Sequence, residues 1–294
     1  MSGGDLDKWA AWLLERRDGG DQEQRAKALE HLLPIRDRVL DNANIRPGET
    51  VLDVGGGDGL IAFGALERAG PAGAVTLSDI SADLVAHASG AAQELGVADR
   101  MSFVVARAED LEPVADSSVD VVTTRSVLIY VDDKAAAFRA FERVLRPEGR
   151  ISLFEPINNY FPWDASEFWG YDSTEVSDLV EKIWAHQGWG PETDASDPMS
   201  NFTEKDLVRY AEEAGLDEVH VELRVDIEPG SWVVDWDRLM GTSPNPNALT
   251  VGESIARALT KEETAHFESV LRERVDRGRA VLRSAYAYLG ASKR

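Results

Sequence analysis

The sequence of 294 residues contains no cysteine. A disulfide, a thiolate nucleophile, a cysteine-ligated zinc site and an iron–sulfur cluster are therefore excluded. Histidine is also scarce, because only five occur and no two lie within five residues of each other. The sequence thus has no local histidine pair that would bind a metal, and we expect no metal site.

Long apolar runs are missing as well. No stretch approaches the ~20 residues of a membrane-spanning helix, and the first residues are acidic where a secretory signal would be basic. Basic residues are in the minority, with 31 Lys and Arg against 53 Asp and Glu and a net charge of -22. The electric field of a negatively charged protein repels phosphate backbones and anionic lipid. We therefore expect a cytoplasmic protein that contacts neither membranes nor nucleic acid.

Hydrophobic residues make up 43% of the chain, which is typical of a globular protein with one large domain or one domain that carries an insertion. Short Val- and Ile-rich runs alternate with helical stretches near 60–69, 81–95 and 134–145. Such runs indicate parallel strands buried on both faces, hence a doubly wound α/β sheet. The expected strands are Val51–Val54, Val75–Leu77, Met101–Val105, Val119–Thr123 and Ile151–Phe154.

The flanking regions have other patterns. Residues 5–17 and 21–43 have the apolar spacing of helices that precede the sheet. After Phe154 comes a stretch with many tryptophans, which is too long for a plain connection. Capping signals predict helices that begin after Thr203, Thr250 and Thr260. The segment 219–228 and the apolar run 283–290 are the remaining strand candidates.

The motif VLDVGGGDGL, residues 51–60, says most about the chemistry of the protein. A buried strand runs directly into glycines and then a helix, which lets backbone N–H groups approach a ligand. Gly57, Gly59 and Ala62 also fit the G-x-G-x-x-A pattern of dinucleotide sites. A buried carboxylate at Asp53 would repel a pyrophosphate, however, and suits a ligand with an ammonium group. Asp79, at the end of the second strand, is placed to accept hydrogen bonds from ribose hydroxyls.

With these motifs, residues 45–155 resemble the core of a class I S-adenosylmethionine-dependent methyltransferase, closest to the quinone-biosynthesis and arsenite type. The resemblance implies an α/β, doubly wound, mostly parallel sheet of seven strands, with N-terminal helices and helical lid insertions. It also implies a cofactor, S-adenosylmethionine. The implied cofactor-binding residues are Asp53, Gly55, Gly57, Asp58, Gly59, Asp79, Ile80, Ala108, Glu109, Arg125 and Ser126.

The chain departs from the family pattern beside the adenine, where Arg107 replaces the usual Asp. Adenine recognition is therefore assigned to the backbone of Ala108 and to Glu109. Arsenite methylation is excluded because it needs cysteine thiolates. The metal-dependent catechol type does not fit either, because Thr124 and Arg125 stand where a metal would need a carboxylate.

Three residues are candidates for a catalytic role. Tyr130 either faces the transferring methyl group or is buried under the next helix. Glu155 either points at the acceptor or caps the turn after its strand. His186 is the histidine of the predicted lid, and imidazole has a suitable pKa for a base, although a lone histidine is more often structural. The lid aromatics are individually more typical of a core than of substrate contacts.

The sequence therefore predicts a metal-independent methyltransferase acting on a small molecule, as a monomer or homodimer. Two alternatives stay open, a nicotinamide-dependent oxidoreductase and a non-catalytic S-adenosylmethionine-binding protein. Residues 155–242 carry -16 of the net charge, which favours neutral or cationic acceptors over polyanions if these carboxylates surround the pocket. The expected division is an N-terminal cover 1–45, a core 46–155, a lid 156–202, a core continuation 203–227, a second helical insertion 228–281 and a closing strand with tail 282–294.

Overall fold

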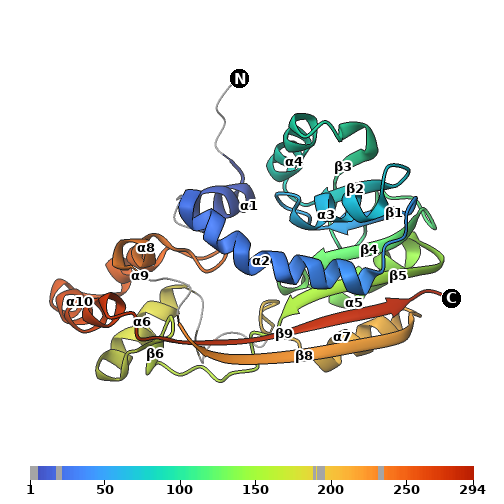
Figure 1. The fold of residues 1–294 in the computed structure, drawn as a ribbon. Helices are drawn as coiled ribbons and strands as arrows, with labels where there is room; N and C mark the ends of the chain where they lie inside the picture. Colours follow the sequence, from blue (N-terminus) through green and yellow to red (C-terminus); the bar gives the residue numbers. More distant parts are fainter. Residues whose placement is uncertain (1–5, 18–21, 188–189, 191–195, 231–234) are drawn as a thin grey trace.

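A single seven-stranded sheet organises the protein, whose computed structural model describes residues 6–17, 22–187, 190, 196–230 and 235–294. The strand order is β3-β2-β1-β4-β5-β9-β8 (Figure 1). β1 to β5 pair in parallel, whereas β9 runs antiparallel to both β5 and β8. The predicted doubly wound, mostly parallel sheet is confirmed. Its strands are β1 (Thr50–Val54), β2 (Ala74–Asp79), β3 (Met101–Val105), β4 (Val119–Arg125), β5 (Leu145–Pro156), β8 (Asp217–Pro229) and β9 (Val281–Ser292).

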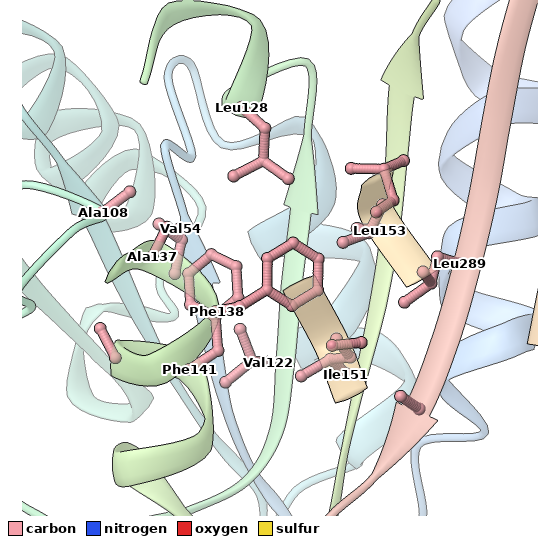
Figure 2. Close-up of a cluster of buried hydrophobic side chains, with 14 of the residues drawn as sticks. Val54, Ala108, Val122, Leu128, Ala137, Phe138, Phe141, Ile151, Leu153 and Leu289 are labelled. Atoms are coloured by element: carbon pink, nitrogen blue, oxygen red, sulfur yellow. The ribbon is translucent and has the colours of Figure 1, made fainter. Parts of the chain in front are cut away.

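Helices cover both faces of the sheet and bury its apolar side chains. On one face, α2 (Gln22–Ala43) packs over β4 and β5, α3 (Leu60–Ala69) over β1 and β2, and α4 (Ala82–Glu94) over β2 and β3. On the other, Phe138 and Phe141 of α5 (Lys134–Val144) pack against Val122 and Ile151, as Figure 2 shows. The same cluster includes Leu207 of α7 (Glu204–Glu213). Burial on both faces explains why the first strands appear in the sequence as continuous apolar runs.

The described residues of the two predicted insertions pack together. Phe168 from the first insertion and Phe267 from the second have ring centroids 5.5 Å apart in a shared buried cluster. Figure 1 shows this group at the far ends of β8 and β9, away from the rest of the sheet. The capping boxes at Thr203, Thr250 and Thr260 are present. The elements of the group are the hairpin β6 (Glu167–Phe168) and β7 (Tyr171–Asp172), α6 (Ser177–Gln187), α8 (Trp236–Gly241), α9 (Val251–Ala258) and α10 (Lys261–Asp276).

The segment Asp7–Arg17, called here the N-terminal segment, lies between the sheet and the insertion helices (Figure 1). It contains α1 (Lys8–Ala11) and a π-helical turn, Trp12–Arg16, where the sequence predicts one regular helix. α1 begins after Asp7 because this side chain accepts hydrogen bonds from the N–H groups of Trp9 and Ala10. Within the described residues, no helix has the length and apolar composition needed to cross a membrane.

Candidate active site

A cavity of about 420 Å³ lies where the carboxyl ends of the parallel strands meet. This edge is where open α/β sheets bind ligands. The cavity is lined by Asp53 from β1, Asp79 from β2, Arg125 from β4 and Pro156 from β5. The loop 106–109 after β3 lines it as well. Ten of the eleven predicted cofactor residues border this one space, and Gly59 lies directly beside it as the N-cap of α3.

The glycine loop after β1 requires residues without a side chain. Gly55 has φ +64°, and a Cβ there would lie 2.2 Å from Cγ2 of Val127. A Cβ on Gly56 would come within 3.0 Å of Oδ2 of Asp53. Gly57 has φ +54°, and its N–H donates to Oδ2 of Asp79 at 3.0 Å. The loop therefore holds the backbone close to the two carboxylates that the sequence identified.

Asp53 is almost fully buried, and its two oxygen atoms differ in their surroundings. Oδ1 accepts a hydrogen bond from the hydroxyl of Thr123 at 2.8 Å, whereas Oδ2 has no partner among the described residues. Burial raises the pKa of Asp53 to about 7, although the Thr123 bond and the charge of Arg125 oppose the rise. A buried acceptor without a donor is costly. Oδ2 therefore has an unused acceptor position beside the glycine loop, which an ammonium group would satisfy.

Asp79 is held by the backbone on both sides. Oδ2 accepts from the N–H of Gly57, and Oδ1 accepts from the N–H of Ser81 at 2.9 Å. Burial is the largest influence on the pKa of Asp79 and raises it, while the two backbone bonds oppose the rise. Each carboxylate oxygen can accept a second hydrogen bond. The side chain is thus fixed in place at the cavity wall with room for two hydroxyl donors.

The predicted adenine side of the cavity lies at the end of β3. Ala108, Glu109 and Ile80 all line the cavity, and Ile80 keeps 48% of its surface exposed. Arg107, the residue that departs from the family pattern, forms an ion pair with Glu109 at 2.5 Å. The carboxylate of Glu109 is therefore directed to Arg107 in this structure. That pairing gives Arg107 a role of its own, which is to orient Glu109 at the cavity wall.

Arg125 and Ser126 follow β4 and line the cavity near Asp53. Ser126 has φ +56°, an unusual value for a residue with a side chain, and its N–H is held by the carbonyl of Phe154 at 2.9 Å. Burial lowers the pKa of Arg125 to about 10, and the positive charge of Arg17 contributes to the lowering. Arg125 still carries its charge at neutral pH.

The three catalytic candidates have different positions. Tyr130 lines the cavity, with its ring edge-on to Trp9 at 5.1 Å. Burial raises the pKa of Tyr130 to about 12, so the phenol keeps its proton near neutral pH and does not act as a base there. Tyr130 thus lies at the cavity wall, and its position at the transferring methyl group stays a prediction.

Glu155 does not face the cavity, so its predicted role at the acceptor is replaced by a structural one. It is fully buried, and its carboxylate accepts hydrogen bonds from the N–H groups of Val127, Leu128 and Ile129 at 2.9, 3.0 and 3.3 Å. Burial raises the pKa of Glu155 to about 7 despite these bonds. Alternation along β5 explains the result, because Phe154 and Pro156 point to the opposite face of the sheet from Glu155.

His186 lies outside the site. It is exposed on α6, whose buried residues Ile183 and Trp184 pack into the core of the insertion helices. It is not among the residues that line the cavity. In the described part of residues 156–202, Pro156 alone borders the cavity, and the predicted lid stays a prediction. In the described part of the acidic region 155–242, no carboxylate lines the cavity.

The N-terminal segment is the cover that the sequence analysis did not identify at residue level. Trp9, Trp12, Leu13 and Arg17 line the cavity. Asp7 anchors the segment at the start of α4, since its Oδ2 accepts from the hydroxyl of Ser81 at 2.6 Å. The apolar spacing of the segment was a signal for a helix with one buried side, but nothing local indicates what that side covers.

A second set of contacts ties the N-terminal segment to the insertion helices. The indole N–H of Trp12 donates to the carbonyl of Ser243 at 3.0 Å, and Nζ of Lys8 donates to Oδ1 of Asn247 at 2.7 Å. The insertions therefore act on the cavity indirectly, by holding the segment that covers it. No group of three or more His, Asp or Glu residues among those described is arranged to hold a metal ion.

Comparison with known proteins identifies relatives for most of this core. The family model described as a methyltransferase domain matches residues 45–215. The ubiquinone/menaquinone biosynthesis C-methyltransferase UbiE of Hahella chejuensis is 38% identical over 117 residues, 40% of this chain and 47% of the relative. The nocamycin O-methyltransferase of Saccharothrix syringae is 34% identical over 160 residues, 54% of each chain. The chain thus spans about half the length of these curated relatives.

A solved structure extends the similarity of fold over nearly the whole chain. It is a geranyl diphosphate methyltransferase in complex with SAM, with a TM-score of 0.51 and 20% identity. The match covers 99% of this chain and 96% of that one. At this level of identity the match shows a shared fold.

Proposed function

Because the chain belongs to the methyltransferase domain family, we propose that it is a class I enzyme that uses S-adenosylmethionine to methylate a small molecule without a metal. The observation that carries this proposal is the pair of carboxylates beside one glycine loop. Asp53 offers an unpartnered oxygen for the ammonium of the methionine part, and Asp79 offers acceptors for the ribose. The same Asp53 oxygen argues against a nicotinamide dinucleotide, whose pyrophosphate it would repel.

The residues of this chain have mainly a binding and positioning role. The cofactor supplies an activated methyl group when bound. Asp53, Asp79 and Ala108 line the cavity along the length that the cofactor would occupy, and Tyr130 and Trp9 border it on the side of the N-terminal segment. That segment shields the cavity from water. Alignment of an acceptor with the methyl group, together with exclusion of water, supplies most of what such a transfer needs.

The acceptor is proposed as a small molecule because the relatives named above act in quinone and nocamycin methylation, by their printed names. Those names include both C- and O-methylation, so the accepting atom is not assigned. The cytoplasmic location, and the choice between a monomer and a homodimer, stay predictions.

Methyl transfer from radiolabelled S-adenosylmethionine into a small-molecule extract of the source cells tests the proposal. We expect label in a low-molecular-weight product with the wild-type protein and much less with Asp79→Ala when the cofactor is not saturating. Calorimetric titration with NAD⁺ and with S-adenosylmethionine distinguishes the methyltransferase from the oxidoreductase alternative. Tight cofactor binding with no labelled product from any extract would favour the non-catalytic alternative.

The affinity for S-adenosylmethionine is expected to depend on pH through Asp53. Its pKa of about 7 in the free protein means that it is largely protonated below pH 7. An ammonium group favours the charged form, so binding releases a proton and the affinity rises with pH, by up to about tenfold per unit between pH 5.5 and 7. The rise should end above about pH 7, where Asp53 is already ionised, and the affinity should fall above about pH 8, where the α-amino group of the cofactor loses its own proton.

Calorimetry at a series of pH values, in buffers of different ionisation enthalpy, measures this effect. Asp53→Asn keeps the shape of the side chain and should remove the rise. Equal affinity of the wild-type protein at pH 5.5 and pH 7 would contradict the assignment of Asp53 to the ammonium group.

A further inference from the structure

Two arginines from distant parts of the chain line the same cavity. Arg125 follows β4, and Arg17 lies at the end of the N-terminal segment, over the ring of Trp12 at 5.7 Å. Their charges are close enough that Arg17 contributes to the lowered pKa of Arg125. In the part of the chain that the structure describes, neither guanidinium donates a hydrogen bond or forms an ion pair. Two like charges in one partly buried cavity are unfavourable unless a ligand neutralises them.

The other charged residues of the cavity already have partners or lie in solvent. Arg107 and Glu109 form an ion pair, and the carboxylate of Asp79 accepts two backbone N–H groups. Asp58 and Asp132 are exposed. Asp53 has one unpartnered oxygen, which the proposed function assigns to the ammonium group of the cofactor. Among the described residues, the buried Asp53 and Glu155 act on the charge of Arg125, but no carboxylate forms an ion pair with either arginine.

The cofactor does not neutralise both arginines. S-adenosylmethionine carries one carboxylate, together with a positive ammonium and a positive sulfonium. Arg125 lies beside Asp53 and Ser126, where the methionine part is expected, so it is the arginine suited to the carboxylate of the cofactor. Arg17 comes from the N-terminal segment, and its charge acts on the pKa of Tyr130. A second anion is needed beside Arg17.

We infer that the methyl acceptor carries an anionic group, a carboxylate or a phosphate, which Arg17 binds. Trp9 and Tyr130 form an aromatic wall next to Arg17, with ring centroids 5.1 Å apart, so the body of the acceptor is aromatic or otherwise apolar. The inference rests on the proposed function, because it places the cofactor beside Arg125. It reverses the preference for neutral or cationic acceptors that the net charge suggested, because the charges that line the cavity decide what enters it.

Binding of simple aromatic probes tests the inference without knowledge of the natural acceptor. The protein is saturated with S-adenosylhomocysteine and titrated with benzoate, phenyl phosphate and uncharged benzamide, with tryptophan fluorescence and calorimetry as readouts. We expect benzoate or phenyl phosphate to bind at least tenfold more tightly than benzamide, and the tighter of the two identifies the anionic group. Arg17→Gln should remove this preference while the affinity for S-adenosylhomocysteine changes less than twofold.

Arg16→Gln is the matched control, because it removes the same charge from a side chain that pairs with Glu253 outside the cavity. It should keep the preference for the anionic probe. Equal binding of all three probes would overturn the inference. It would also be overturned if Arg17→Gln weakened S-adenosylhomocysteine as much as benzoate, because Arg17 would then belong to the cofactor site. Failure of the wild-type protein to bind S-adenosylhomocysteine would instead overturn the proposed function.

Discussion

Asp79→Ala is expected to weaken the binding of S-adenosylmethionine at least tenfold. The substitution removes the proposed acceptor for two ribose hydroxyls, and hydrogen bonds to a charged partner contribute about 1.5–3 kcal/mol each. It also leaves the N–H groups of Gly57 and Ser81 without their acceptor, which loosens the glycine loop. Because about 1.4 kcal/mol corresponds to a factor of ten, the loss of one such bond already accounts for the expected effect. Isothermal titration calorimetry measures it.

Asp99→Ala serves as the control, because Asp99 is exposed in the turn before β3 and does not line the cavity. Its affinity for the cofactor should equal that of the wild-type protein. Unchanged affinity in a folded Asp79→Ala variant, with folding verified by circular dichroism, would reject the ribose assignment.

Glu155→Ala is expected to lower the free energy of unfolding by about 3 kcal/mol or more. The variant leaves three buried backbone N–H groups without an acceptor, and each such group costs about 1–3 kcal/mol. These groups belong to the turn after Arg125 and Ser126, so cofactor binding should weaken as well. Equilibrium unfolding in urea measures the stability. Unchanged stability would show that water replaces the carboxylate at no cost.

Two further variants make the Glu155 experiment specific. Glu112→Ala removes an exposed carboxylate from the surface loop before β4 and should change the stability by less than about 0.5 kcal/mol. Glu155→Gln retains an oxygen acceptor and most of the shape, so its loss of stability should be smaller than that of Glu155→Ala.

The raised pKa of Glu155 also predicts that the stability of the protein depends on pH. Its pKa in the folded protein is about 7, against an ordinary value of 4.5, so the folded state keeps a proton that the unfolded chain releases. The contribution of this group is therefore greatest below about pH 4.5 and is lost as the pH rises to about 7. Glu155→Gln should remove that part of the pH dependence.

Local sequence determined most of the fold and the cofactor side of the cavity. The strands β1, β2, β4 and β5 have buried Val, Leu and Ile residues, because helices cover both faces of the sheet. The glycine loop is equally local, since Gly55 and Gly57 need positive φ values that few other residues adopt. Asp53 and Asp79 come from the ends of neighbouring parallel strands, and this arrangement brings them to one edge of the sheet.

The sequence by itself thus determined the sheet, the glycine loop and the two carboxylates that line the cavity, because each depends on spacing within a few residues. Only the tertiary structure decided what covers the cavity. The N-terminal segment reaches it through Asp7 on Ser81, a contact across more than seventy positions that no local pattern records. The same holds for Glu155, whose role depends on which face of β5 meets the turn after β4. Long-range packing therefore places the N-terminal segment over the cavity, Glu155 under the turn after β4, and Arg17 at the proposed acceptor site.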